Sequence, residues 1–226
     1  MGVDETINRL VGTGVMDEVI VVGIDNTADR IAEYTPCCDP QYGGGKLIQY
    51  ESFIINTVKP FIDQSYRSLT ARQNTAIVGS SLGGLASFYI ARRNPTVFSK
   101  SAGMSSSFWW SNQDMVKTVV AASGKVAGQF YIDAGTTAMR DAMVADGYIQ
   151  GVDLYYYVAR GASHNETSSG RVWNGEPGKR RARERVFVGS ILSGCWGGKP
   201  SLASGASGHA TDVAPFLVTL APSRKG

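Results

Sequence analysis

The sequence predicts an α/β fold in which a mostly parallel sheet is flanked by helices. First, the chain has 226 residues, of which 43% are hydrophobic and 18% charged, so it is long enough for one sizeable core and too short to favour two. Second, EVIVVGI at 18–24 and TAIVGS at 75–80 are continuous apolar runs, typical of strands buried on both faces. Third, strand segments alternate with helical segments from residue 75 onward, as in βα repeats.

The expected elements follow one another along the chain. Residues 3–11 have the apolar spacing of a helix that ends at Gly12. Residues 46–64 read as an amphipathic helix, in which Pro60 is expected to kink or loosen the last turn. The remaining expected strands are 75–80, 99–106, 128–135 and 152–160, and the remaining expected helices are 82–93, 112–123 and 137–147.

The stretch GSSLGG at 79–84 joins an expected strand to an expected helix. Gly79, Ser81 and Gly83 satisfy the G-x-S-x-G pattern in the strand-turn-helix context that a nucleophile elbow requires. A serine on such a tight turn projects its hydroxyl above the sheet, and the positive end of the following helix favours an oxyanion nearby. Ser81 is therefore the predicted nucleophile. Ser80 is the weaker candidate, because it has no glycine two positions before it.

A serine nucleophile needs a base, and the chain contains only two histidines. His164 lies in GASHNE, after the last expected strand, and so fits the hydrolase order of nucleophile, acid and histidine, whereas His209 lies in a Gly/Ser/Ala-rich stretch. The acid should follow the strand at 128–135 and hold the imidazole in the required tautomer. Asp133, at the end of that strand, and Asp141, on the next helix, are both candidates.

Charge and cysteine content exclude several other kinds of function. The net charge is +3, and the basic excess lies after residue 170, mostly in KRRARER at 179–185, which we interpret as a solvated charge run and not as a nucleic-acid site. Three cysteines, two of them adjacent, form no zinc-site pattern, so we expect neither a metal nor a cofactor. The chain shows no apolar run of membrane-spanning length and no signal peptide, which favours a cytoplasmic protein without membrane partners.

Five segments together carry a resemblance to a known family. They are VIVVGIDNTADRIAEYTP, NTAIVGSSLGGLASFYIARRNPTVFSK, SSSFWW, YIDAGTT and GASHNE. Roughly over residues 3–173, the chain resembles the esterase family of the α/β-hydrolase fold that includes enterochelin esterases, feruloyl and acetyl-xylan esterases, S-formylglutathione hydrolases and mycolyltransferases. The resemblance implies a small-molecule ester as substrate without specifying which ester.

The same resemblance assigns roles to individual residues. It implies Ser81 as nucleophile, His164 as base and the backbone N–H of Leu82 as one oxyanion donor. The side chains that it places near the substrate pocket or its rim are those of Phe108, Trp109, Trp110, Arg30 and Glu33. Core packing is the alternative interpretation for the three aromatic residues.

Three departures from the family pattern qualify that assignment. Ala138 stands where similar proteins have the acid, and Asp141, three residues later on the same expected helix face, is the predicted substitute, with Asp133 or no acid as the alternatives. The strand that carries the second oxyanion donor should precede residue 18 and lie beside the elbow strand, so the chain resembles a family member that lacks its first strands. The resemblance also ends near residue 173.

The missing strand leaves a gap in the expected sheet. A rearrangement could fill the gap, another segment could fill it, or it could stay open. RVFVGSIL at 185–192 and APFLVTLA at 214–221 are apolar enough to be strands. We otherwise expect two regions, an esterase-like domain over residues 1–173 and a divergent, poorly ordered tail over residues 174–226.

These observations predict a serine carboxylic-ester hydrolase that works by two-step acyl transfer. Ser81 attacks the ester carbonyl while His164 takes its proton, and water then releases the acyl group. The alternative is a relative with the hydrolase fold but an impaired or absent catalytic site, which Ala138 and the missing strand favour.

Overall fold

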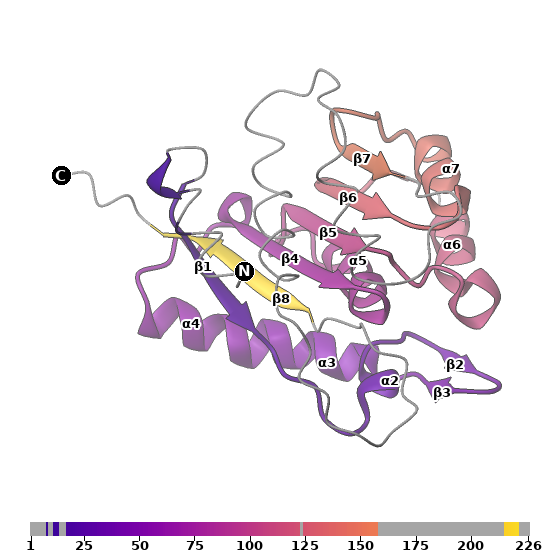
Figure 1. Cartoon of the computed structure of the whole chain (residues 1–226), viewed down its shortest axis with the longest axis horizontal. Helices are drawn as coiled ribbons and strands as arrows, with labels where there is room; N and C mark the ends of the chain where they lie inside the picture. Colours follow the sequence, from indigo (N-terminus) through magenta and orange to yellow (C-terminus); the bar gives the residue numbers. More distant parts are fainter. Residues whose placement is uncertain (1–7, 9–10, 14–16, 123, 158–214, 222–226) are drawn as a thin grey trace.

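A six-stranded sheet is the main feature of the computed structural model, which describes residues 8, 11–13, 17–122, 124–157 and 215–221. Its strands are β1 (Val19–Gly23), β4 (Thr75–Ser80), β5 (Lys100–Met104), β6 (Gln129–Asp133), β7 (Leu154–Tyr157) and β8 (Phe216–Leu220). They lie in the order β1-β8-β4-β5-β6-β7 (Figure 1). β4 is buried along its whole length, as its unbroken apolar run predicts.

Strand direction is uniform except at β8. β4, β5, β6 and β7 pair in parallel, whereas β8 pairs antiparallel with both β1 and β4. β1 therefore points the same way as β4, and the carboxyl ends of these parallel strands meet at one edge of the sheet. The predicted α/β class with a mostly parallel sheet is confirmed.

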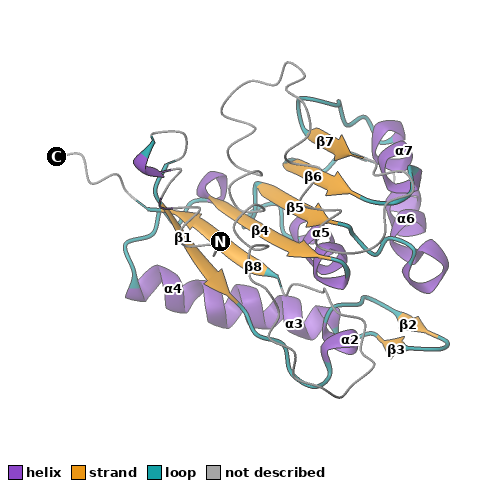
Figure 2. Cartoon of the chain, in the orientation of Figure 1, coloured by secondary structure: helices purple, strands orange, loops and turns teal. Residues whose placement is uncertain are grey.

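β8 fills the position beside the elbow strand. Figure 2 shows β8 between β1 and β4. Phe216 pairs with Val78 of β4 on one side and with Gly23 of β1 on the other. Residues 216–220 of the apolar segment predicted at 214–221 therefore fill the expected gap, and they run antiparallel to the neighbouring strands. RVFVGSIL at 185–192 lies outside the described residues.

The helices agree with the predicted pattern in type and order. They are α2 (Arg30–Glu33), α3 (Leu47–Phe53), the π-helical turn η1 (Ile54–Val58), α4 (Lys59–Ser65), the 3₁₀ turn η2 (Arg72–Asn74), α5 (Leu82–Arg93), α6 (Trp110–Ala122) and α7 (Ala138–Ala145). Of the helix predicted over 3–11, the structure describes only residues 8 and 11, which are both helical. A short hairpin of β2 (Cys38–Asp39) and β3 (Gly43–Gly44) and the four-residue α2 were not predicted, because so few residues show no periodicity.

The irregular part of the long helix lies one turn earlier than predicted from Pro60, because the last turn, in α4, stays α-helical. The π-helical turn Ile54–Val58 lies just before Pro60 and separates α3 from α4. Proline has no N–H to donate to the carbonyl of residue 56, and its ring would collide with that carbonyl in a regular helix. A wider turn at this point relieves both problems.

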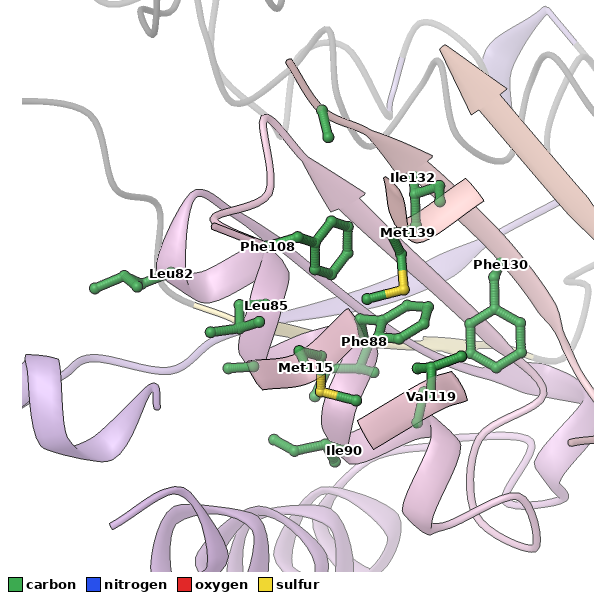
Figure 3. Close-up of a cluster of buried hydrophobic side chains, with 14 of the residues drawn as sticks. Leu82, Leu85, Phe88, Ile90, Phe108, Met115, Val119, Phe130, Ile132 and Met139 are labelled. Atoms are coloured by element: carbon green, nitrogen blue, oxygen red, sulfur yellow. The ribbon is translucent and has the colours of Figure 1, made fainter. Parts of the chain in front are cut away.

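The two faces of the sheet carry separate apolar clusters. The larger cluster joins strand residues to residues of α3, α5, α6 and α7, and Figure 3 shows Phe88 of α5 near Phe108, Phe130 and Met139. Phe88 packs edge-on against Phe108 and Phe130 at ring-centroid distances of 5.2 and 5.5 Å. The smaller cluster on the other face contains, among the described residues, side chains of strands only.

Candidate active site

Ser81 occupies the turn between β4 and α5 in a strained backbone conformation. Its φ is 56° and its ψ is −121°, a region that residues other than glycine rarely adopt. Three backbone hydrogen bonds hold it there: the Ser81 N–H donates to Met104 O at 2.8 Å, and the N–H groups of Leu85 and Ser107 each donate to Ser81 O at 3.1 Å. A strained residue fixed by its surroundings in this way is typical of a functional position.

Gly79 makes the elbow possible by letting two backbone segments meet. A Cβ added at residue 79 would lie 2.3 Å from the carbonyl oxygen of Gly83 and 2.9 Å from Ser87 Oγ. The first of these atoms belongs to the backbone of α5, so it cannot move aside without moving the helix. Close packing against α5 therefore requires a glycine at the first position of the G-x-S-x-G pattern.

Gly79→Ala is expected to destabilise the fold by about 1–3 kcal/mol, the usual cost of forcing extra atoms into a packed interior. Urea unfolding measures this effect. The matched control is Gly135→Ala, since a Cβ there meets nothing within 4 Å, and it should leave the unfolding free energy within about 0.5 kcal/mol. Equal stability of the Gly79→Ala variant and the unaltered chain would contradict the close approach.

The N-terminus of α5 lies directly after Ser81. Leu82 is the first residue of this 12-residue helix, and Arg92 and Arg93 lie in its last turn, where cations complement the helix dipole. The positive end of the helix is thus directed at Ser81, where it would favour a negatively charged group.

Ser107 is the side chain that sequence reasoning missed. Its Oγ lies 3.1 Å from Ser81 Oγ, and its relative exposure is 1%, against 4% for Ser81. The Ser105–Ser107 run follows β5 at the same sheet edge as Ser81. The carboxyl end of the strand next to the elbow strand is a place where functional side chains gather in βα repeats, and this position could have indicated Ser107 from the sequence.

Asp133 ends β6 and is bound to the same Ser105–Ser107 turn. The N–H of Ser105 donates to Asp133 Oδ1 at 3.0 Å, and the N–H of Ser106 donates to the Asp133 carbonyl at 2.9 Å. Asp133 Oδ2 is buried and has no hydrogen-bond partner within the described part of the chain. Burial raises the pKa of Asp133 to about 6, against an opposing effect of the Ser105 N–H.

This raised pKa makes a pH-dependent contribution to stability. The Asp133 carboxyl binds its proton more tightly in the folded chain than in the unfolded chain, where its pKa has the ordinary value of 3.8. Its contribution to stability is therefore complete below pH 3.8 and is lost as pH rises through about 6. The Asp133→Asn variant has no carboxyl at this position and so lacks this pH-dependent loss of stability. Its free energy of unfolding, relative to that of the unaltered chain, should rise by about 2 kcal/mol between pH 4.5 and 7.5. Urea unfolding at both pH values tests this, and a difference that is constant with pH would contradict it.

Asp141→Asn serves as the comparison for that measurement. Asp141 lies in the first turn of α7, and its exposed carboxylate accepts a hydrogen bond from Arg140 Nε at 2.7 Å. Hydrogen bonding to Thr137 and then to Arg140 lowers the pKa of Asp141, so its contribution to stability is lost as pH falls. Its replacement should therefore change the pH dependence in the opposite direction.

His164 lies outside the described residues, as does His209, so the structure supplies no geometry for the predicted base. The last described residue before it is Tyr157, at the end of β7, which is the edge strand next to β6. Ser81 and Asp133 both contact the Ser105–Ser107 turn, whereas Asp141 lies on α7, the helix that follows β6 in the chain.

The aromatic residues divide between core and surface. Phe108 and Trp110 are buried in the larger apolar cluster, and Trp110 Nε1 donates to Cys37 O at 3.2 Å. Trp109 is 56% exposed, with its ring centroid 6.1 Å from that of Trp110. The ring centroid of Tyr42, at the tip of the β2–β3 hairpin, also lies 6.1 Å from that of Trp110.

The two predicted rim residues belong to α2. Arg30 lies over the Tyr34 ring at 5.5 Å, and desolvation by burial lowers its pKa. Glu33 accepts hydrogen bonds from the backbone N–H and the hydroxyl of Thr27, at 3.1 and 2.7 Å. Both residues follow β1 and so lie beyond the carboxyl end of the sheet.

The described residues show neither a metal-binding cluster nor a membrane-spanning helix. Within the described ranges, no group of three or more His, Cys, Asp or Glu side chains is arranged to hold a metal ion. Across those same ranges, none of the helices combines the length and the apolar character needed to cross a bilayer.

The strand order, the elbow and the helix that follows it define the α/β-hydrolase fold. Among solved structures, the chain is similar to a ferulic acid esterase, with a TM-score of 0.51 and 20% identity over 74% of this chain and 71% of that one. It is also similar to the siderophore hydrolase EstA from Aspergillus nidulans, with a TM-score of 0.51 and 16% identity over 75% and 76% of the two chains. At these identities the likeness is one of fold.

Sequence comparison gives the family. The model of the family described as "Putative esterase" matches residues 1–147, and the chain belongs to this family. A curated relative, "Uncharacterized protein YbbA" from Bacillus subtilis (strain 168), is 30% identical over 103 residues, which are 43% of this chain and 41% of the relative. The match therefore spans less than half the length of that relative.

Proposed function

We propose that the protein is a serine carboxylic-ester hydrolase that acts on a small-molecule ester through an acyl-enzyme on Ser81. The observation that carries this proposal is the strained Ser81 backbone, with φ of 56°, at a strand-to-helix turn held by three backbone hydrogen bonds. Such strain costs about 1–3 kcal/mol, and a nucleophile held above the sheet by a tight turn would account for it. Membership of the esterase family supports the same reaction.

The mechanism divides the reaction into two acyl transfers. Ser81 Oγ attacks the ester carbonyl and gives its proton to the base, for which we propose His164. The proton then passes to the leaving alcohol, and water, activated by the same base, releases the acid. The N–H of Leu82, at the positive end of α5, is the proposed oxyanion donor.

Two carboxylates compete for the role of triad acid. Asp141 follows from the spacing to Ala138 on α7, but it is exposed and paired with Arg140. Asp133 is buried, ends the strand two places from β4, and is bound to the turn that contacts Ser81. Burial and proximity support Asp133, since a triad acid must hold the imidazole in a site screened from water.

The test combines turnover with covalent labelling. The full chain is incubated with p-nitrophenyl acetate and, separately, with a fluorophosphonate that phosphonylates activated serines, and the labelled peptide is identified by mass spectrometry. We expect hydrolysis above the buffer rate and a single label on Ser81. An unlabelled chain without hydrolysis, or a label on another serine, would refute the proposal.

The second candidate function is a hydrolase-fold protein without efficient catalysis. The observation that favours it is β8, which runs antiparallel beside β4. β8 occupies the place that the family resemblance gives to the strand with the second oxyanion donor, and Pro215, which precedes β8 at the end nearest Ser81, has no N–H to donate. Loss of one such donor costs about 10²- to 10³-fold in rate. Labelling of Ser81 with hydrolysis at the buffer rate would favour this candidate.

A further inference from the structure

The hydroxyl of Ser107 faces that of Ser81 inside the protein, at an oxygen–oxygen distance of 3.1 Å. We propose that Ser107 is a positioning residue for the nucleophile, whose hydroxyl donates a hydrogen bond to Ser81 Oγ so that the Ser81 proton is directed to the base. The inference rests on the proposed function, because it assigns a role only if Ser81 is the nucleophile.

Two contacts fix Ser107 relative to Ser81. Besides the contact between the hydroxyls, the Ser107 N–H donates to the Ser81 carbonyl at 3.1 Å. One contact joins the backbones and the other joins the side chains, so neither residue can shift or rotate alone. Both residues are buried, with 1% and 4% exposure, which keeps competing water away from the hydroxyl pair.

The turn that carries Ser107 is fixed by a hydrogen bond to Asp133 at the end of β6. Ser105 has a φ of 42°, and its N–H donates to the carboxylate of Asp133 at 3.0 Å. The Ser106 side chain packs closely against Gly84 and Gly103: an added Cβ would lie 2.6 or 2.4 Å from Ser106 Oγ. The hydrogen bond to Asp133 fixes the backbone of the turn, and this turn brings Ser107 to Ser81.

The number of protons on the two hydroxyls supports Ser107 as the donor of this hydrogen bond. Each hydroxyl has one proton and two acceptor lone pairs, so only one of the two can donate to the other. If Ser81 donated, its proton would point at Ser107 and would have to turn before reaching the base. If Ser107 donates, the Ser81 proton stays available.

The same direction favours the chemical step. As Ser81 Oγ bonds to the carbonyl carbon and its proton passes to the base, negative charge develops on Oγ before it is shared with the acyl group. A hydrogen bond from Ser107 to an oxygen that is gaining charge becomes stronger. Ser107 keeps its own proton throughout. Its effect should therefore appear in kcat and not in KM.

The experiment compares two serines of one turn. Ser107→Ala and its matched control Ser106→Ala are each assayed for kcat and KM with p-nitrophenyl acetate, for the rate of fluorophosphonate labelling at Ser81, and for thermal unfolding. Ser106 is also buried, and its Oγ has no hydrogen-bond partner among the described residues. We expect Ser107→Ala to lower kcat and the labelling rate about 10- to 100-fold with KM nearly unchanged, and Ser106→Ala to change neither.

A second pair of variants removes dependence on stability. Ser107→Thr and Ser107→Val have side chains of nearly the same shape and differ in the hydroxyl. Ser107→Thr should retain more kcat than Ser107→Val by about tenfold or more, even if Ser107→Ala does not fold.

The outcomes separate this inference from the proposed function. Equal kcat values for Ser107→Thr and Ser107→Val, or equal losses for Ser107→Ala and Ser106→Ala, would overturn the positioning role while Ser81 continued to be labelled. A rise in KM without a fall in kcat would also overturn it. If the unaltered chain is neither labelled nor active, the proposed function fails and the inference fails with it.

Discussion

Ser81→Ala is expected to lower kcat/KM for p-nitrophenyl acetate by about 10⁴- to 10⁶-fold, the scale of nucleophile loss in enzymes of this mechanism. The substitution removes the attacking oxygen and keeps the Cβ, so the backbone with φ of 56° carries no more strain than before. The three hydrogen bonds that fix the turn are made by backbone groups and are retained. The variant should therefore fold normally, and its rate should approach that of buffer.

The matched control is Ser80→Ala. Ser80 is the neighbouring buried serine, the last residue of β4, and it was the weaker candidate by its glycine spacing. Its replacement should leave kcat/KM within a few-fold of the unaltered chain. If Ser81→Ala hydrolysed the ester as fast as the unaltered chain, the serine mechanism would be wrong, and loss of activity in Ser80→Ala alone would move the nucleophile by one residue.

Asp133→Asn is expected to lower kcat by about 10⁴-fold at pH 7.5, the scale reported for loss of the carboxylate that orients a catalytic histidine. At that pH the Asp133 carboxyl, with a pKa of about 6, is ionised and can accept a hydrogen bond from an imidazole. Asparagine has nearly the same shape and preserves the packing of β6, but it offers an amide in place of a charged acceptor. Kinetic assay at fixed pH measures the effect.

Asp141→Asn distinguishes the two carboxylates. Because Asp141 is exposed and paired with Arg140, we expect its replacement to cost less than about tenfold in kcat. The reverse ranking, with the larger loss in Asp141→Asn, would assign the acid to α7. Small losses in both variants would favour a Ser-His pair that works without an acid.

Local patterns were sufficient to predict most of the fold. The unbroken apolar run of Thr75–Ser80 and the glycines around Ser81 specify a buried strand and a tight turn without help from distant residues. The place of β8 could not be predicted in the same way. Its apolar sequence is compatible with a strand, but its partners, β1 and β4, are set by a vacancy in the sheet and not by anything in residues 216–220.

The candidate site was predicted less completely, for a related reason. The role of Ser107 depends on its meeting Ser81 across 26 positions of sequence, and three consecutive serines have the composition of an ordinary loop. The burial of Asp133, which distinguishes it from Asp141, depends likewise on how β5 and β6 pair. Sequence spacing along a helix favoured Asp141 because it describes neighbours on one element and not the depth of a side chain in the fold.

The position of β8 has a consequence for how the chain acquires its structure. Thr75 pairs with Thr219, so a central rung of the sheet joins residues that are almost two thirds of the chain apart. Contacts of such long sequence separation form slowly, because a large loop must close before they contribute. Until residues 216–220 have left the ribosome, β1 and β4 each present an unpaired edge, and such edges invite association with other chains. The sheet that supports Ser81 is therefore completed only after residues 216–220 have been synthesised.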